Sequence, residues 1–309
     1  MARQPRIWVM ITVHHLEHSR SQRILWLLEE LGLPYEVKRY RRLPSLLAPP
    51  ELRAVHPLGK SPLIEDSTLA GRVIAETGAI IDYLLTSYGN GRLAPRAGTT
   101  DRLGYTYWMY AAEGSAMTPL LLKLITDELP TRSPWLVRPV AAGIARALRQ
   151  ALVTPNLTAH IQLWEDTLGQ MPWFAGEAFT AADIMMSFPV EAAADRAGAA
   201  SMPHIKAWLD TIHRRPAYRR ALERGGPYIY SNLFQSRLDG NHDAGRQGGG
   251  QDGGGGKPDE LFHGGNSWDE NTAPVYGPTP CLKTYKTLIL PRLYPLRRRV
   301  GADIYHGCA

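Results

Sequence analysis

The spacing of hydrophobic and polar positions changes once along this chain, near residue 90. Before that point, short apolar or alternating runs, which are typical of strands, are separated by stretches with helical spacing. After it, the spacing is helical up to about residue 225, and beyond residue 231 it has no regular period. The pattern therefore predicts an α/β domain, an all-helical domain and a C-terminal tail.

The α/β half reads, in order, as strand, helix, strand, irregular segment, hairpin and helix. Strands are expected at residues 7–13 and 35–40 and in a hairpin around Gly71 that begins at 63–65, and helices at 20–31, 51–55 and 76–85. Gly32 ends the first helix, and Pro34 prevents it from continuing. The first strand, helix and strand form a βαβ unit.

The helical half follows a linker rich in glycine and proline at residues 89–98. Helices are expected at residues 101–126, 134–153 and 156–168, after 180–183, and from 203 onward. Thr180 and Asp183 have the spacing of an N-capping box, so we expect them to be structural. The predicted domains are residues 5–88 and 97–225.

The tail, residues 231–309, has a different composition. Residues 240–256 are largely glycine, and acidic and basic residues are nearly balanced. Such a segment buries too little apolar surface to fold, so we expect it to be mostly disordered. Its apolar run at 287–290 is far shorter than the ~20 residues that cross a bilayer. The pattern leaves the role of the tail open.

Composition narrows the class of protein. The chain has 309 residues, of which 44% are apolar and 21% charged, as in globular proteins with two domains. Without a signal-like N-terminus or a membrane span, it is expected to be cytoplasmic. The net charge of +6 is spread along the chain, which favours a solvated basic surface over nucleic-acid binding.

Candidate chemistry lies at the start of the first helix, where Ser19 and Ser21 stand. The first backbone N–H groups of a helix are unpaired and its dipole favours negative charge, so an anion such as a thiolate can bind there. The only cysteines are Cys281 and Cys308. Any thiol at this helix start must therefore come from another molecule.

Three histidines precede that helix, but no carboxylate pattern accompanies His14, His15 and His18. We therefore expect no metal site. The alternative is that His15 or His18 lines the binding pocket.

Four motifs follow one another in a characteristic order. Residues 15–32 read His-Leu-Glu-His-Ser-Arg-Ser-Gln-Arg-Ile-Leu-Trp-Leu-Leu-Glu-Glu-Leu-Gly, 57–62 read Pro-Leu-Gly-Lys-Ser-Pro, 75–80 read Ala-Glu-Thr-Gly-Ala-Ile, and 180–183 read Thr-Ala-Ala-Asp. Over residues 6–225 the chain resembles the glutathione transferase superfamily, with most similarity to serine-type fungal and bacterial members. The resemblance implies a thioredoxin-like domain, an all-helical domain and a homodimer.

The resemblance also implies roles for individual residues at the thiol. Ser19 matches the hydroxyl that activates glutathione, in a Ser-x-x-x-Arg pattern completed by Arg23. Ser21 is the rival for that role. Pro62 matches the cis-proline of the family, and Ser61, where valine or isoleucine is commoner, would offer its backbone to the cysteinyl part of glutathione.

The ends of glutathione have their own matching residues. Glu76 and Thr77 match the acidic-plus-hydroxyl pair that holds the γ-glutamyl end, with threonine where many members have serine. Lys60 matches a position near the glycine carboxylate. Tyr105, Trp108, Met109 and Tyr110 are candidates for the wall of an electrophile pocket, and helical phase does not choose among them.

The implied activity is attack of the glutathione thiolate on a small hydrophobic electrophile, as in detoxification, with glutathione as co-substrate and no cofactor. A free thiol has a pKa of about 8.5, and lowering it by about two units needs roughly 3 kcal/mol. One alternative is glutathione-dependent reduction of hydroperoxides at the same site. Another is a non-catalytic binding module with the glutathione fold.

Overall fold

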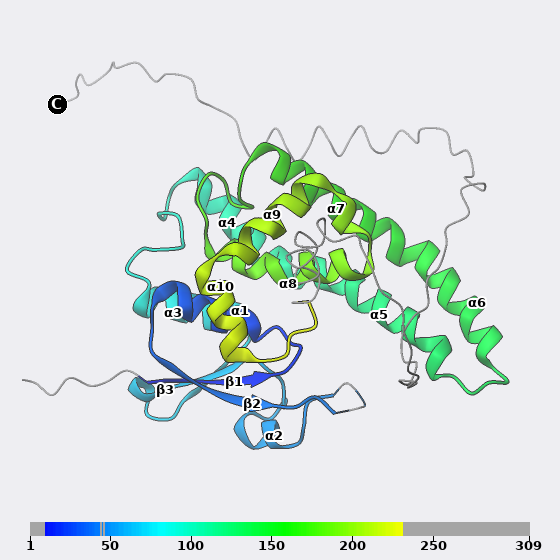
Figure 1. Ribbon diagram of the computed structural model, residues 1–309, viewed down its shortest axis with the longest axis horizontal. Coiled ribbons are helices and arrows are strands. Elements are labelled where there is room, and N and C mark those ends of the chain that lie inside the picture. Colours follow the sequence, from blue (N-terminus) through cyan, green and yellow to red (C-terminus); the bar gives the residue numbers. More distant parts are fainter. Residues whose placement is uncertain (1–9, 44, 46, 231–309) are drawn as a thin grey trace, which may run out of the picture. The chain divides into compact units, whose positions relative to one another are not determined.

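The computed structural model describes residues 10–43, 45 and 47–230, which belong to one compact unit (Figure 1). A half with a sheet comes first and a helical half follows, as the change in spacing near residue 90 predicts. The tail predicted to be disordered, 231–309, lies outside the described residues.

Within the described residues, the sheet has four strands in the order β2 (Tyr35–Tyr40), β1 (Ile11–Leu16), β3 (Leu63–Asp66) and β4 (Val73–Ala75). Strand β1 runs parallel to β2, with Ile11 opposite Tyr35, and antiparallel to β3, with Ile11 opposite Asp66. Strand β4 closes the edge antiparallel to β3. A βαβ unit followed by a hairpin is the thioredoxin-like arrangement, so that prediction is confirmed.

Two strand boundaries differ from the prediction. Strand β1 continues to Leu16, beyond the expected end at residue 13, while residues 7–9 lie outside the described part. His14 and His15 fit in a buried strand because both ring nitrogens of His14, and Nδ1 of His15, find hydrogen-bond partners. The predicted hairpin around Gly71 is a wider turn, since Ser67–Leu69 forms a 3₁₀ helix capped by Asp66.

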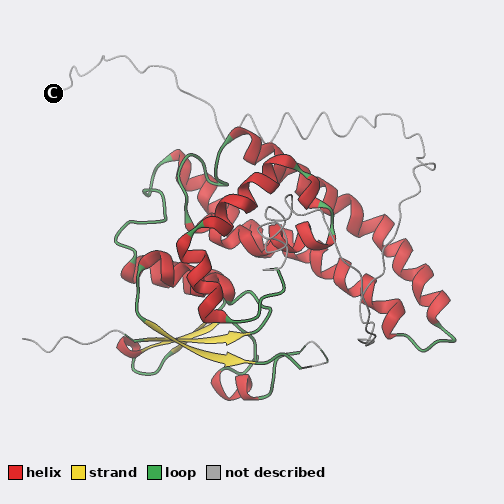
Figure 2. Cartoon of the chain, in the orientation of Figure 1, coloured by secondary structure: helices red, strands yellow, loops and turns green. Residues whose placement is uncertain are grey.

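Helices cover both faces of the sheet, as Figure 2 shows. Helices α1 (Gln22–Leu31) and α3 (Thr77–Tyr88) lie on one face. The short helix α2 (Glu51–Val55) lies on the other, where Leu52 packs against Leu16 and Leu63. All three helices occur where the sequence predicts them, although α3 continues three residues further.

The helical half begins with two long helical arms, and one π-helical turn interrupts each of them without reversing its direction. Helices α4 (Thr100–Ala111) and α5 (Met117–Arg132) are joined by a π turn at Ala112–Ala116. A second π turn, Arg149–Val153, joins α6 (Arg138–Leu148) to α7 (Thr154–Gln170). The predicted break between residues 153 and 156 is therefore wrong, because Pro155 occupies the first turn of α7, where a missing N–H is tolerated.

Three further helices complete this half: α8 (Ala181–Arg196), α9 (Pro203–Arg214) and α10 (Pro216–Gly225). Helix α8 is buried over almost its whole length. The predicted capping box at its start is confirmed, because Thr180 Oγ1 accepts from the Ala182 N–H at 3.3 Å and Asp183 Oδ2 from the Thr180 N–H at 2.9 Å.

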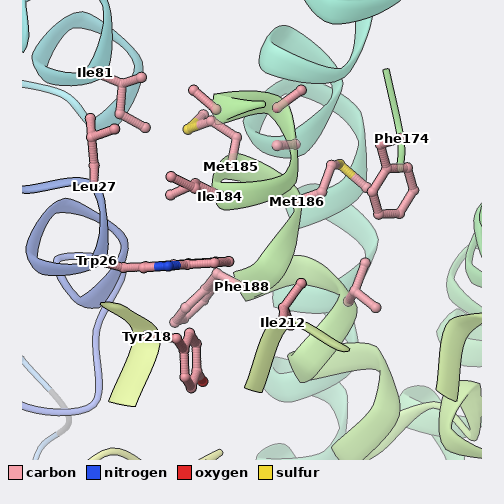
Figure 3. Close-up of a cluster of buried hydrophobic side chains, with 14 of the residues drawn as sticks. Trp26, Leu27, Ile81, Phe174, Ile184, Met185, Met186, Phe188, Ile212 and Tyr218 are labelled. Atoms are coloured by element: carbon pink, nitrogen blue, oxygen red, sulfur yellow. The ribbon is translucent and has the colours of Figure 1, made fainter. Parts of the chain in front are cut away.

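Helix α1 is shared by both halves. Its Trp26 side chain packs edge-on against Tyr218 of α10, with 5.0 Å between the ring centroids, and Figure 3 shows it beside Phe188 of α8. Leu27 lies toward Ile81 of α3 in the same view. Burying an aromatic or leucine side chain stabilises a fold by about 1.5–3 kcal/mol. This packing holds the first turn of α1 at the junction of the two halves.

Candidate functional site

A pocket opens beside the first turn of α1. It is lined by the loop before β3, the end of β4, the start of α3 and one arginine of α1's entry turn, namely Arg20, His56, Leu58, Lys60, Ser61, Pro62, Leu63, Ala75, Glu76 and Thr77. All of the residues predicted to bind glutathione border this one pocket. Sequence reasoning missed the other five, although each adjoins or lies within a motif that it used: Arg20, His56, Leu58, Leu63 and Ala75.

The loop before β3 is fastened to β1 through the side chain of Ser61. The Ser61 hydroxyl donates to the carbonyl of His14 at 2.8 Å and accepts from the N–H of Leu16 at 3.2 Å. The peptide bond from Ser61 to Pro62 is cis, as predicted. Among the described residues, the backbone N–H and C=O of Ser61 have no hydrogen-bond partner, so both can serve a ligand.

The start of α3 carries the acidic and hydroxyl pair. Glu76 has a backbone φ of 71°, which is strained for a residue with a side chain, and its carboxylate is exposed. Thr77 is buried, and its hydroxyl accepts from Arg23 Nη2 at 3.4 Å. Strain of this kind is held in place mainly at functional sites, and the unpaired N–H groups of the first helical turn suit a carboxylate.

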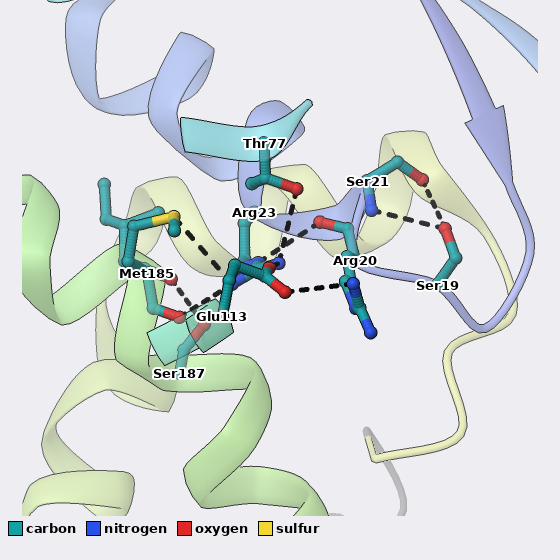
Figure 4. Close-up of polar contacts among 9 residues, drawn as sticks. Ser19, Arg20, Ser21, Arg23, Thr77, Glu113, Met185 and Ser187 are labelled. Carbon is teal, nitrogen blue, oxygen red and sulfur yellow. Dashed lines mark hydrogen bonds and ion pairs between the residues drawn. The ribbon is translucent and has the colours of Figure 1, made fainter. Parts of the chain in front are cut away.

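The two serines touch each other. Ser19 Oγ and Ser21 Oγ are 2.7 Å apart, and the N–H of Ser21 also donates to Ser19 Oγ at 3.2 Å (Figure 4). Ser21 is fully buried, and its oxygen lies 2.8 Å from His15 Nδ1. Ser19 is slightly exposed, at 5%. Neither serine lines the pocket, but Arg20 between them does.

Arg23 connects four elements behind the pocket. Its guanidinium is buried and donates to the carbonyl of Met185 in α8 at 2.8 Å, to Thr77 of α3 and to Glu113 of the first π turn. Glu113 also pairs with Arg20, 2.9 Å from its Nη1 (Figure 4). Sequence reasoning could not find Glu113, because nothing near it in the chain marks the π turn that places it.

The predicted wall residues lie elsewhere. Tyr105 and Trp108 are buried in the core, where Trp108 packs on Phe174 with ring centroids 4.8 Å apart. Burial raises the pKa of Tyr105 to about 12. Met109 is half-buried, and Tyr110 is exposed. None of them lines the pocket, so a role in holding the electrophile stays a prediction.

The histidines before the helix differ in their contacts. His14 binds Tyr40 and Glu65, each at 2.8 Å. Burial lowers the pKa of His15 to about 4, and electrostatic interactions with the neighbouring Arg39 and His18 add to the effect. Its ring is therefore neutral at pH 7. Neither His15 nor His18 lines the pocket.

Across residues 10–43, 45 and 47–230, no three histidine, cysteine or acidic side chains gather as a metal site would require. No helix in that same part of the chain is both long and apolar enough to cross a membrane. The expected absence of a metal stays a prediction.

Comparison with protein families gives two matches. Residues 19–87 match the family described as "Glutathione S-transferase, N-terminal domain", and residues 150–216 match "Glutathione S-transferase, C-terminal domain". Glutathione S-transferase 3 of Schizosaccharomyces pombe is 33% identical, over 70% of this chain and 88% of its own length. Glutathione S-transferase 1 of Saccharomyces cerevisiae is 32% identical, over 70% and 95%.

Solved structures agree on the fold. A glutathione S-transferase from Actinobacillus pleuropneumoniae is 34% identical, covers 72% of this chain and 96% of its own, and superposes with a TM-score of 0.57. A glutathione transferase homologue from Sulfitobacter with bound glutathione has the same TM-score at 19% identity, over 70% of this chain and 98% of its own. At 19% identity, the similarity to the Sulfitobacter protein shows the fold alone.

Proposed function

This chain belongs to the glutathione S-transferase family, and we propose that it binds glutathione in the pocket beside α1 and activates its thiol for attack on an electrophilic carbon. One observation carries the proposal. Five residues matched to glutathione contacts from separate segments of the chain, Lys60, Ser61, Pro62, Glu76 and Thr77, converge on one pocket. That pocket adjoins a helix start with a serine hydroxyl.

The pocket offers complementary groups to both ends of the tripeptide. The exposed carboxylate of Glu76 would pair with the α-amino group of the γ-glutamyl residue, whose carboxylate would lie at the first turn of α3 beside Thr77. Lys60 would pair with the glycine carboxylate. The free backbone groups of Ser61 would hold the cysteinyl residue as a strand is held.

Ser19 is proposed to activate the thiol. A hydrogen bond from its hydroxyl to sulfur favours the thiolate, because bonds to charged acceptors contribute about 1.5–3 kcal/mol. The dipole of α1 adds to this, because its positive end lies at the start of the helix. The thiol loses its proton to solvent, the sulfur electron pair forms a C–S bond, and the leaving group departs with the electrons of the broken bond.

Conjugation of glutathione to a chromogenic aryl halide tests the activity and the residue. Ser19→Ala is expected to lower kcat/KM by about 100-fold, which corresponds to roughly 3 kcal/mol. Ser201→Ala is the matched control, because the Ser201 hydroxyl donates only to the carbonyl of Gly198, within the 3₁₀ turn that precedes α9. Turnover that is unchanged in Ser19→Ala would remove Ser19 from the mechanism.

The two alternatives give different results. A peroxidase would reduce cumene hydroperoxide faster than it conjugates the aryl halide. A non-catalytic module would do neither, and calorimetry showing no binding at millimolar glutathione would overturn the proposal. The proposed physiological form is a cytoplasmic homodimer acting on small hydrophobic electrophiles.

A further inference from the structure

We propose that His15 is a positioning residue that acts through Ser21 to direct the hydroxyl hydrogen of Ser19 at the bound sulfur. The inference rests on the proposed function, because it needs a thiolate beside Ser19. It concerns side chains that the pocket itself does not contain.

The three side chains form a continuous chain of contacts. His15 Nδ1 lies 2.8 Å from Ser21 Oγ, and Ser21 Oγ lies 2.7 Å from Ser19 Oγ. All three residues are buried, His15 in strand β1 and the serines at the entry to α1. Both distances are those of hydrogen bonds, so one hydrogen must lie in each gap.

Counting hydrogens fixes the direction of the chain. Each hydroxyl has one hydrogen, and a thiolate can only accept. If Ser19 donates to the sulfur, the hydrogen between the two serines must come from Ser21. The hydrogen between Ser21 and His15 must then come from the ring, so His15 carries its hydrogen on Nδ1. In this arrangement, all three hydrogen bonds point toward the sulfur and strengthen one another.

The other neutral tautomer reverses the chain. With the hydrogen on Nε2, Ser21 donates to Nδ1, Ser19 donates to Ser21, and no hydroxyl hydrogen is left for the sulfur. The carbonyl of Leu16, at 3.4 Å from Ser21 Oγ, is a weaker competing acceptor. The tautomer of His15 therefore decides whether Ser19 can serve as a donor.

The surroundings of Nε2 favour the productive tautomer. Nε2 is buried and makes no hydrogen bond of ordinary geometry with any described residue, although the backbone of Gly225 lies beside it and raises the pKa of the ring, against the larger effect of burial. A buried N–H without a partner is rarer and costlier than a bare nitrogen lone pair. The low pKa of His15 keeps the ring neutral at pH 7, so that the tautomer and not the charge sets the direction.

The nitrogen chemical shifts of the His15 ring, measured by NMR with labelled histidine in the glutathione complex, test the tautomer directly. The signal is assigned by its loss in His15→Asn. We expect Nδ1 to be protonated and Nε2 to be bare. A ring protonated on Nε2, with its hydrogen toward Gly225, would overturn the inference.

Variants test the effect on the thiol through the pH profile of kcat/KM. His15→Leu and Ser21→Ala are expected to raise the apparent pKa of the bound thiol by about one unit, a tenfold loss of activity on the acid side. His15→Asn, whose amide can donate from near the Nδ1 position, should restore the profile. His14→Leu is the matched control, since His14 is the adjacent, equally buried residue and bonds Tyr40 and Glu65 instead.

The outcomes separate the inference from the proposed function. Absence of glutathione binding by the wild-type protein removes both. If the apparent pKa of the bound thiol rises in Ser19→Ala but is unchanged in Ser21→Ala and His15→Leu, only the role of His15 is removed. Should His15→Leu fail to fold, Ser21→Ala decides, because it removes the same link by losing a single oxygen.

Discussion

At the scale of single residues, Ser19 and Ser21 differ in what surrounds their oxygens. Ser21 is fully buried and is in contact with His15, Leu16 and Ser19. Ser19 keeps a small exposed fraction, and its side-chain oxygen forms hydrogen bonds, among the described residues, with Ser21 alone. These contacts favour Ser19 as the group that reaches the sulfur, with Ser21 as its hydrogen-bond partner. The sequence motif alone did not choose between the two serines.

His15 should make folding stability depend on pH. Its pKa is about 4 in the folded protein against an ordinary 6.5. Between these two pH values, the His15 ring is therefore protonated in the unfolded chain but neutral in the folded protein. The stabilisation is full above 6.5 and is lost as pH falls to 4, by up to about 3 kcal/mol. Denaturant unfolding across this range should show that His15→Asn lacks this slope while His14→Asn keeps it. An identical slope in both variants would contradict the assignment.

Substitutions at Glu76 should separate the cost of backbone strain from the contribution of its carboxylate to glutathione binding. Its φ of 71° is accessible to glycine at lower cost than to any other residue. Glu76→Gly is therefore expected to be more stable than Glu76→Ala by about 1 kcal/mol, whereas both lose affinity for glutathione. Chemical denaturation and calorimetry on the same two proteins measure the two effects. Equal unfolding free energies would mean that the backbone here is not strained.

At the scale of elements, the first π turn brings a carboxylate to the back of the pocket. The extra residue in this turn lets Glu113 reach both Arg20 and Arg23 from between α4 and α5. π turns are often found at functional sites. The ion pairs thereby link the helical half to the first turn of α1 through Arg23, and to the entry turn before it, where the serines lie, through Arg20.

Loss of Glu113 should cost far more than loss of an exposed carboxylate. Glu113→Ala leaves the buried guanidinium of Arg23 without its ionic partner, with an expected loss of roughly 3 kcal/mol of unfolding free energy. Glu128→Ala breaks an exposed pair with Arg132 in α5 and should cost less than about 1 kcal/mol. Urea unfolding measures the loss of unfolding free energy in each variant. Equal losses would mean that the ion pairs of Glu113 do not stabilise the fold more than an exposed pair does.

Elements with a local signal were predictable, and those without one were not. The spacing of apolar residues and the terminating Gly32 predict α1, and Thr180 with Asp183 predicts the start of α8, because these signals act within a few residues. The π turns have no such signal. Pro155 suggests a break between helices, but it lies in the first turn of α7, where a proline is tolerated. The end of β1 was misplaced because the partners of His14, Tyr40 and Glu65, are remote in sequence.

The candidate site follows the same rule. The pocket residues lie in short motifs, so the resemblance could supply Lys60, Ser61 and Glu76. Glu113 and the link from His15 to Ser21 depend on how segments pack, which the motifs do not encode. The burial of Tyr105 and Trp108 likewise reflects the packing of α4 against α8.

At the scale of the whole molecule, α5 and α6 lie side by side (Figure 1). These two helices and the short segments that follow them, residues 133–137 and 149–153, expose many apolar side chains. The more exposed among them are Leu121, Ile125, Trp135, Leu136, Val140, Ile144 and Leu152. Apolar surface of this extent marks an interaction site in soluble proteins. We propose that a second copy of the chain covers part of it.

Sedimentation equilibrium tests the homodimer. The chain has a mass of 34.3 kDa, and the wild-type protein is expected to sediment with twice that mass. Ile125→Asp should shift the equilibrium toward the monomer, because a charge would be buried in the interface. Leu47→Asp, at an exposed leucine in the other half, is the control. A wild-type monomer would contradict the proposed assembly.

The central claim is that this protein lowers the pKa of the glutathione thiol through Ser19. Ultraviolet absorbance of the thiolate, followed against pH with glutathione bound to the wild-type protein and to Ser19→Ala, measures it without an electrophile. The account predicts a bound thiol with a pKa about two units below the ~8.5 of free thiols, and a value close to the free one in Ser19→Ala. The same lowered pKa in both proteins would contradict it.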